Sequence, residues 1–257
     1  MTAATPAPRT LYVHDDLSDV LRALGEESRA WRLGQSLLAR LRRDTGRVVI
    51  LTLAQQLDAL IARGDHAPFA RALGIGRAGA RVAAQVHART GWFPSIHRVD
   101  AWREEDGRGG YVIAGPASLA SQLGSAIEAP SIAIVDDTIF SGLTMRTVAA
   151  AWPADPRRRV HAFCLRAVGE SLEAVAHLIP VTAGFAAAGR ILDDVSFINA
   201  SGLVERTAIR RAGQPSLAFF ERPEWMAAWF PGYHDDVIAT CRELRQELDT
   251  HSDVITP

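Results

Sequence analysis

The sequence predicts an α/β fold: a central, mostly parallel sheet with helices on both faces, followed by a C-terminal cap. Short apolar runs that suit buried strands alternate with segments of helical periodicity, which is the pattern of βαβ units. The chain has 257 residues, of which 48% are hydrophobic, so it can bury a large core. After residue 189 the alternation ends, and an irregular stretch with several aromatic residues leads to a last helix.

The expected elements follow in chain order. Apolar residues at helical spacing indicate a helix over residues 16–43, although Gly25 and Gly34 weaken its continuity. The segments expected to be strands are residues 48–51, 95–102, 111–114, 132–135, 160–165 and 181–185. The segments expected to be helices are one through Leu57 and Leu60, then residues 81–89, 119–127, 143–152, 172–178 and 235–248.

These elements group into three predicted parts. Residues 1–45 form an N-terminal helical segment, residues 46–185 the α/β core, and residues 186–257 a C-terminal cap with the terminal helix. The polar, glycine-rich residues 103–110 between two predicted strands indicate a mobile hairpin loop.

The charge pattern excludes several chemistries. The formal net charge is −1 and the pI is near 6.7, which argues against a nucleic-acid binder that works by bulk charge. The sequence contains no lysine, so a Schiff-base lysine, a Walker A lysine and a lysine general base are all excluded. Any phosphate must therefore be bound by arginine, by backbone N–H groups or through a metal ion.

Other sequence features point to a cytoplasmic protein. Cys164 and Cys241 are too few for a disulfide framework or a zinc site, and the apolar surroundings of Cys164 predict a buried, inert thiol. The eight histidines are scattered singly and show no metal-ligand spacing. No apolar stretch is long enough to span a membrane, and the N-terminus lacks the pattern of a secretory signal.

The strongest chemical signal lies in residues 131–145. An apolar strand pattern runs directly into Asp136 and Asp137, and a short loop with Ser141 and Gly142 then leads into a helix. Ligands of open α/β sheets bind at the carboxyl ends of strands, and a helix N-terminus attracts anions. Two acids beside a phosphate cradle require sugar hydroxyls or a divalent cation as partners, so a sugar phosphate satisfies the whole pattern. The alternative is a strand end at which the acids only cap a helix.

This pattern resembles the signature of the type I phosphoribosyltransferases, which bind 5-phosphoribosyl-1-pyrophosphate (PRPP). The resemblance implies that Asp136 and Asp137 hold the ribose hydroxyls as the catalytic pair, with Mg²⁺ held mainly by PRPP and in part by these two acids. Phe140 is bulkier than the small residues usual in the family's loop. The residues that the resemblance assigns to the 5-phosphate are Thr138, Phe140, Ser141, Gly142, Leu143 and Thr144.

The family also has an upstream pyrophosphate turn and a mobile loop that closes over PRPP. The matching segments here are residues 74–80 and 103–110, which assigns Gly76, Arg77, Ala78, Arg103 and Arg108 to pyrophosphate. The first segment could instead be a plain connection between helices with Gly74 as a C-cap, and the second an ordinary solvated hairpin tip.

The acceptor site carries the weakest signal. Phe197 and Asn199 could stack on and hydrogen-bond a nucleobase or another small aromatic ring, although Phe197 also suits a core position. The resemblance implies transfer of the phosphoribosyl group from PRPP to such an acceptor, with pyrophosphate released, by a homodimer. Two alternatives stay open: a non-catalytic PRPP sensor, and an unrelated α/β hydrolase or phosphatase that acts on a sugar phosphate.

Overall fold

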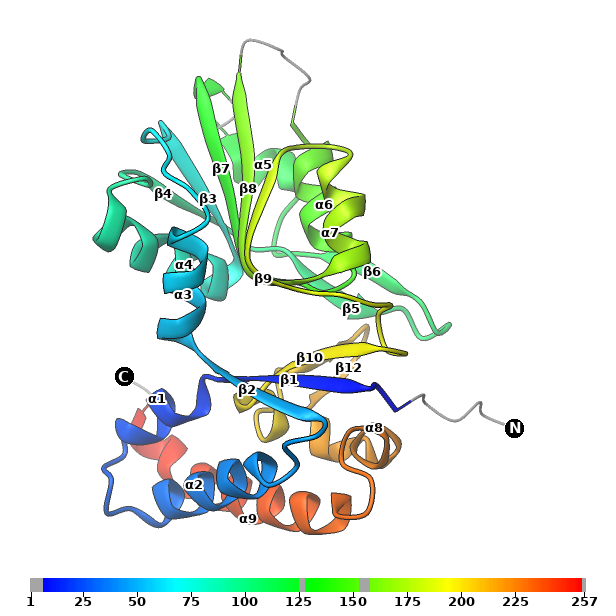
Figure 1. The fold of residues 1–257 in the computed structure, drawn as a ribbon. Coiled ribbons are helices and arrows are strands. Elements are labelled where there is room, and N and C mark those ends of the chain that lie inside the picture. The colour runs from blue at the N-terminus through cyan, green and yellow to red at the C-terminus, as the bar shows by residue number, and fades with distance from the viewer. Residues whose placement is uncertain (1–6, 125–127, 153–157, 256–257) are drawn as a thin grey trace. The chain divides into compact units, whose positions relative to one another are not determined.

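The computed structural model describes residues 7–124, 128–152 and 158–255, with side chains described as far as residue 250. The N-terminal residues 1–6 and the end of the helix predicted at 119–127 lie outside the described residues. The chain divides into two compact units: residues 54–191 form one, and residues 1–53 with residues 192–257 form the other. The first and last parts of the chain therefore belong to one unit, which has a parallel sheet of its own (Figure 1).

A five-stranded parallel sheet forms the centre of the 54–191 unit, in the order β4-β3-β7-β8-β9. This confirms the predicted α/β fold with its parallel sheet. Ile132, Ile134 and Val135 of the middle strand are 0% exposed, because an interior parallel strand is covered on both faces. The strands are β3 (Arg71–Ile75), β4 (Ile96–Val99), β7 (Ser131–Ile139), β8 (Arg159–Val168) and β9 (Val181–Ala187).

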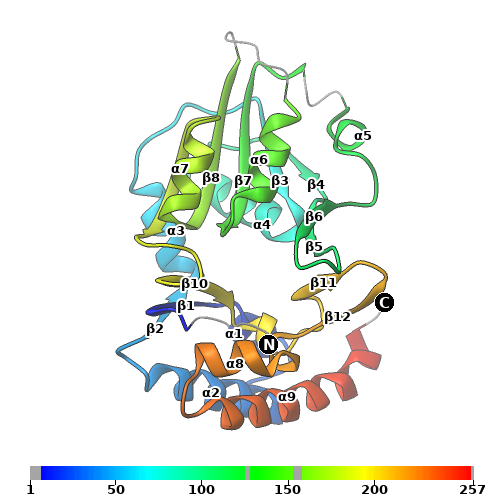
Figure 2. The same ribbon diagram turned by 90° about the vertical axis from the view of Figure 1, so that its right-hand side faces the viewer.

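Helices cover both faces of this sheet (Figures 1 and 2). Helices α3 (Leu53–Ile61) and α4 (Gly76–Thr90) lie on one face, and α6 (Leu143–Ala150) and α7 (Gly169–Ala176) lie on the other. The short helix α5 spans Leu119–Leu123. Apolar side chains from the strands pack with those of α6 and α7, as the predicted helical patterns require.

The predicted strand over residues 95–102 is in fact two strands. After β4 ends at Val99, the backbone of Asp100 is hydrogen-bonded to the side chain of Gln122. The N–H of Asp100 donates to Gln122 Oε1 at 2.7 Å, and Gln122 Nε2 donates to the carbonyl oxygen of Asp100 at 3.0 Å. The chain then enters β5 (Trp102–Glu105), which pairs antiparallel with β6 (Tyr111–Ala114). Arg103 therefore lies on a strand, and the expected loop starts three residues later than predicted, at residue 106.

The other unit contains strands that the sequence analysis missed. Its three-stranded parallel sheet places β1 (Thr10–Asp15) between β2 (Val48–Thr52) and β10 (Val195–Asn199). The N-terminal segment is therefore not wholly helical, and the strand at 181–187 is not the last one. The unit also contains β11 (Ile209–Arg211), β12 (Gln214–Leu217), α1 (Leu17–Arg22), α2 (Arg29–Arg42), α8 (Pro223–Trp229), α9 (His234–Ile255) and the 3₁₀ turns η2 (Ser201–Leu203) and η3 (Phe219–Glu221).

The helix predicted over residues 16–43 is interrupted. Helix α1 ends at Arg22, and Gly25 has a φ of +92°, a left-handed conformation that a continuing α-helix does not allow. Ser28 caps the second helix, α2, by accepting from the N–H of Trp31 at 3.0 Å. The buried faces of these helices join a core that includes Leu11, Leu38 and Val237. In the described part of the chain, no helix combines the length and apolar character that a membrane crossing requires.

Candidate functional site

The two acids of the sequence signature lie on the middle strand of the five-stranded sheet. Strand β7 continues through Asp136 and Asp137 to Ile139, pairing with β8 over its whole length, so the acids lie within the strand rather than after it. Both acids are partly exposed, whereas the apolar residues before them are buried. The strand thus brings polar groups to the surface at its carboxyl end, where open α/β sheets bind ligands.

A buried arginine on the neighbouring strand holds one of the acids. Arg166 of β8 is only 1% exposed and donates to Asp137 Oδ2 at 3.0 Å. Its other terminal nitrogen donates to Oε1 of Gln56, on α3, also at 3.0 Å. Thr138 Oγ1 donates to the same carboxylate oxygen at 3.0 Å. The orientation of the Asp137 carboxylate is therefore fixed by a charged partner and a hydroxyl.

The neighbouring acid has a different electrostatic environment. Asp136 Oδ1 accepts from the backbone N–H of Asp137 at 2.8 Å. Burial raises the pKa of Asp136 well above its usual value, and the adjacent charge of Asp137 raises it further, while Arg166 acts in the opposite direction. The pair is therefore not two equal carboxylates: Asp137 is held by a cation, and Asp136 takes up a proton more readily than an ordinary aspartate does.

The loop after the acids turns directly into α6. Gly142 precedes the helix with a φ of +70°, a left-handed conformation that glycine adopts without a steric cost. Ser141 Oγ accepts from the N–H of Leu143 at 3.4 Å, and Gly142 is buried while Thr144 is partly exposed. A Cβ at residue 142 would lie 3.4 Å from the carbonyl oxygen of Ser171, so this side of the glycine faces α7. The backbone N–H groups of this turn form the kind of site that attracts anions.

Arg103 reaches this loop from the β5–β6 hairpin. Its Nη1 donates to Ser141 Oγ at 3.3 Å, and its guanidinium lies over the rings of Tyr111 and Phe140, at 4.7 Å and 5.6 Å from their centroids. Burial lowers the pKa of Arg103, while Tyr111 and Glu105 act in the opposite direction. Arg108, assigned to the same role from the sequence, lies exposed at the hairpin tip, where its backbone N–H donates to Asp106 Oδ1 at 2.8 Å.

The upstream glycine segment forms a strand-to-helix turn beside the acids. Gly74 lies in β3, which pairs with β7, so the reading of Gly74 as a helix C-cap is wrong. Gly76 has a φ of +60° and begins α4, whose first turn exposes Arg77 and Ala78. A Cβ at Gly79 would lie 2.3 Å from the carbonyl oxygen of Val135, so only glycine allows this turn to pack against β7 just before Asp136.

The predicted acceptor residues lie in the other unit. Phe197 and Asn199 are on β10, two residues apart and therefore on one face of the strand. The ring of Phe197 is 8% exposed and stacks on Tyr12 with centroids 5.0 Å apart. Their assignment to an acceptor stays a prediction.

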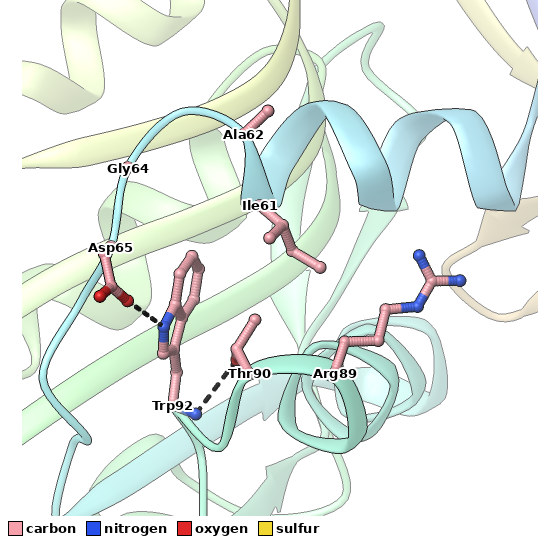
Figure 3. A pocket seen from close by; sticks show the side chains of 7 residues that line it. All are labelled: Ile61, Ala62, Gly64, Asp65, Arg89, Thr90 and Trp92. Carbon is pink, nitrogen blue, oxygen red and sulfur yellow. Dashed lines mark hydrogen bonds between the residues drawn. The ribbon is translucent and has the colours of Figure 1, made fainter.

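A cavity of about 440 Å³ lies in the 54–191 unit, at the carboxyl-terminal ends of α3 and α4 (Figure 3). Trp92 Nε1 donates to Asp65 Oδ1 at 3.2 Å beside it. This cavity contains none of the predicted site residues. It is lined by Ile61, Ala62, Gly64, Asp65, Arg89, Thr90 and Trp92.

The acid pair is the part of the predicted site that suits a metal ion. Among the described residues, no group of three or more His, Cys, Asp or Glu side chains could hold a metal. Mg²⁺ characteristically binds through one or two carboxylates together with substrate phosphates, and Asp136 and Asp137 fit that pattern. Cys164, which pairs with Asp136 across the ladder, is 0% exposed as predicted, and burial raises the pKa of its thiol.

The sequence analysis missed Arg166 and Gln56. Arg166 interrupts the apolar run of β8, and an arginine within a buried strand must have a polar partner. Its position in that run could therefore have predicted a buried ion pair. Gln56 lies at a buried position of an amphipathic helix, where a polar side chain also indicates a buried hydrogen-bond partner.

No family model matches the sequence, and no curated protein matches it significantly. Among solved structures, it is similar to a purine phosphoribosyltransferase from Pyrococcus horikoshii Ot3, at 18% identity and a TM-score of 0.36 over 56% of this chain and 87% of that one. It is also similar to a hypothetical protein from Neisseria gonorrhoeae with bound ppGpp, at 14% identity and a TM-score of 0.40 over 57% of this chain and 85% of that one. A third similar structure is the Helicobacter pylori xanthine-guanine-hypoxanthine phosphoribosyltransferase, at 10% identity and a TM-score of 0.31 over 72% of this chain and 90% of that one. Similarity at these TM-scores assigns no function to this chain.

Proposed function

We propose that this protein is a Mg²⁺-dependent phosphoribosyltransferase that moves the 5-phosphoribosyl group from PRPP to a nucleobase or another small aromatic acceptor. The proposal depends on one observation. Within eight residues, from Asp136 to Leu143, the chain presents two acids, a left-handed glycine turn and a helix N-terminus at the carboxyl end of the middle strand. A ribose bearing a 5-phosphate has the matching groups in the matching order.

The acids of this segment, its loop N–H groups and two hydroxyls each have a proposed part in binding. The Asp137 carboxylate, oriented by Arg166, accepts hydrogen bonds from the ribose hydroxyls together with Asp136. The backbone N–H groups of the loop and the hydroxyls of Ser141 and Thr144 donate to the 5-phosphate. The sugar is thereby held at both ends, which fixes the direction of C1.

The reaction breaks the bond between C1 and the pyrophosphate oxygen, and the electron pair leaves with pyrophosphate. A lone pair of the acceptor nitrogen forms the new bond to C1, and the acceptor loses a proton. Arg77 and the N–H groups of the Gly76 turn are proposed to bind the departing pyrophosphate, because they lie at the start of α4, directly after the strand that pairs with β7. Mg²⁺, when bound, would neutralise part of the charge of the leaving group.

The remaining parts of the proposal concern partners. Phe197 and Asn199 are proposed to contact the acceptor ring, and the protein is proposed to act as a homodimer in the cytoplasm. The absence of lysine leaves arginine and Mg²⁺ to balance the charge of PRPP.

The experiment incubates the protein with PRPP, Mg²⁺ and a panel of nucleobases and other ring acceptors while pyrophosphate release is followed. Release that depends on one acceptor supports the transferase. Binding of PRPP with no release in any mixture would favour the non-catalytic sensor instead. Release of inorganic phosphate without an acceptor would indicate a sugar-phosphate phosphatase. Asp137→Asn serves as the matched inactive variant.

A further inference from the structure

The contacts of Arg103 do not match a role in holding pyrophosphate. Its guanidinium lies against the Phe140–Ser141 loop, with Nη1 3.3 Å from Ser141 Oγ. The pyrophosphate turn, by contrast, is at the end of β3. Besides stacking on Tyr111, Arg103 therefore contacts the loop assigned to the 5-phosphate.

Two aromatic rings hold the guanidinium in place. Tyr111, from the partner strand of the hairpin, has its centroid 4.7 Å from the guanidinium carbon, and Phe140 has its centroid at 5.6 Å. Guanidinium groups stack on aromatic faces because they are planar and weakly hydrated. Phe140 therefore has a specific partner in Arg103.

The position of the cation complements the turn below it. Ser141 Oγ accepts both from Arg103 and from the N–H of Leu143, the first residue of α6. The guanidinium thus lies beside the same helix end whose N–H groups attract an anion. The groups in direct contact with it, a hydroxyl and two rings, carry no formal negative charge, and Glu105 on the same strand is a nearby acid whose charge acts on it. A phosphate at the turn would add a negative charge on the side of the guanidinium that faces the helix end.

We propose that Arg103 is a cation of the 5-phosphate site, held by Phe140 and Tyr111, and that it does not bind pyrophosphate. This inference rests on the proposed function and changes one residue assignment made from the sequence. It predicts that any ligand with a ribose 5-phosphate depends on Arg103, whatever its group at C1. In a chain without lysine, this arginine and the loop N–H groups together would hold the phosphate.

The test measures dissociation constants by calorimetry, in the presence of Mg²⁺, for ribose 5-phosphate, PRPP and inorganic pyrophosphate. Arg103→Gln should weaken ribose 5-phosphate and PRPP by a similar factor, on the order of 10- to 100-fold, and leave pyrophosphate unchanged. Arg103→Lys should restore only part of the loss, because an ammonium neither stacks nor donates in the guanidinium geometry. Phe140→Leu should weaken both ribose ligands less strongly.

Arg89→Gln is the matched control, because Arg89 pairs with Asp58 at the other end of α4. It should leave all three dissociation constants unchanged. Weakening of PRPP and pyrophosphate by Arg103→Gln, with ribose 5-phosphate unaffected, would overturn the inference and return Arg103 to the pyrophosphate. Unchanged binding of all three ligands by Arg103→Gln would overturn it as well. Failure of the unmodified protein to bind either ribose ligand would instead refute the proposed function.

Discussion

Replacing Arg166 with methionine tests whether the buried ion pair supports the acid pair. Arg166 donates to Asp137 Oδ2 and to Gln56 Oε1, each at 3.0 Å. Methionine is long and flexible enough to fill much of the space but donates no hydrogen bond. Both acceptors therefore lose this donor, and the Asp137 carboxylate loses a charged partner.

The expected cost follows from the burial of each group. Gln56 is 2% exposed, and a buried acceptor that loses its donor costs about 1–3 kcal/mol. The hydrogen bond to Asp137 involves two charges and contributes roughly 1.5–3 kcal/mol, with the lower end appropriate because the carboxylate is 20% exposed. Arg166→Met should therefore lower the free energy of unfolding by about 3–5 kcal/mol, the usual cost of breaking a buried ion pair.

Denaturant titration followed by circular dichroism measures this change. Arg98→Met is the control, because Arg98 is 48% exposed and pairs with Asp100 at the surface, so its loss should cost less than about 1 kcal/mol. The double variant Arg166→Met/Asp137→Asn should cost less than the two single changes combined, by roughly 1–3 kcal/mol. A cost for Arg166→Met as small as that of Arg98→Met, or strict additivity with Asp137→Asn, would refute the reasoning.

Two further predictions concern packing and pH. Gly79→Val should lower the free energy of unfolding by about 1–3 kcal/mol, because a Cβ there would lie 2.3 Å from the carbonyl oxygen of Val135; an unchanged melting temperature would contradict this. Burial and the nearby His66 and Arg159 lower the pKa of His161 to about 4, so stability should be present above the unfolded pKa of about 6.5 and lost as the pH falls from there towards 4. His161→Phe should reduce that loss by up to about 1.4 kcal/mol per pH unit. Denaturant titrations at several pH values measure the free energy of unfolding, and the same dependence on pH in both proteins would contradict the prediction.

The β7–α6 segment was predictable because its signals are local. An apolar run predicts a buried strand, the acids mark its emergence at the surface, and Gly142 precedes a helical pattern. The structure differs in one detail: the strand continues through the acids to Ile139, because β8 is long enough to pair with it there. The sequence pattern cannot indicate the length of the neighbouring strand.

The features that were missed depend on residues far apart in the chain. Strand β1 pairs with β10 from Thr10↔Val195 onwards, and neither segment has the uninterrupted apolar run of an interior strand. The Arg103–Ser141 contact spans 38 residues, and the Arg166–Gln56 contact spans 110. Such contacts are set by the order of strands and the packing of helices, so local patterns identify the residues as unusual but do not identify their partners.

The central claim is that PRPP binds at Asp136 and Asp137, and calorimetric titration of PRPP tests it most directly. The unmodified protein should bind PRPP in the presence of Mg²⁺ and more weakly after EDTA is added. Asp137→Asn should weaken binding by about 30- to 150-fold, which corresponds to the loss of an interaction of about 2–3 kcal/mol. Circular dichroism of the same sample checks that the variant is folded. The claim would be contradicted if Asp137→Asn and the unmodified protein bound PRPP equally tightly and Mg²⁺ did not change either affinity. The absence of PRPP binding in the unmodified protein would also contradict it.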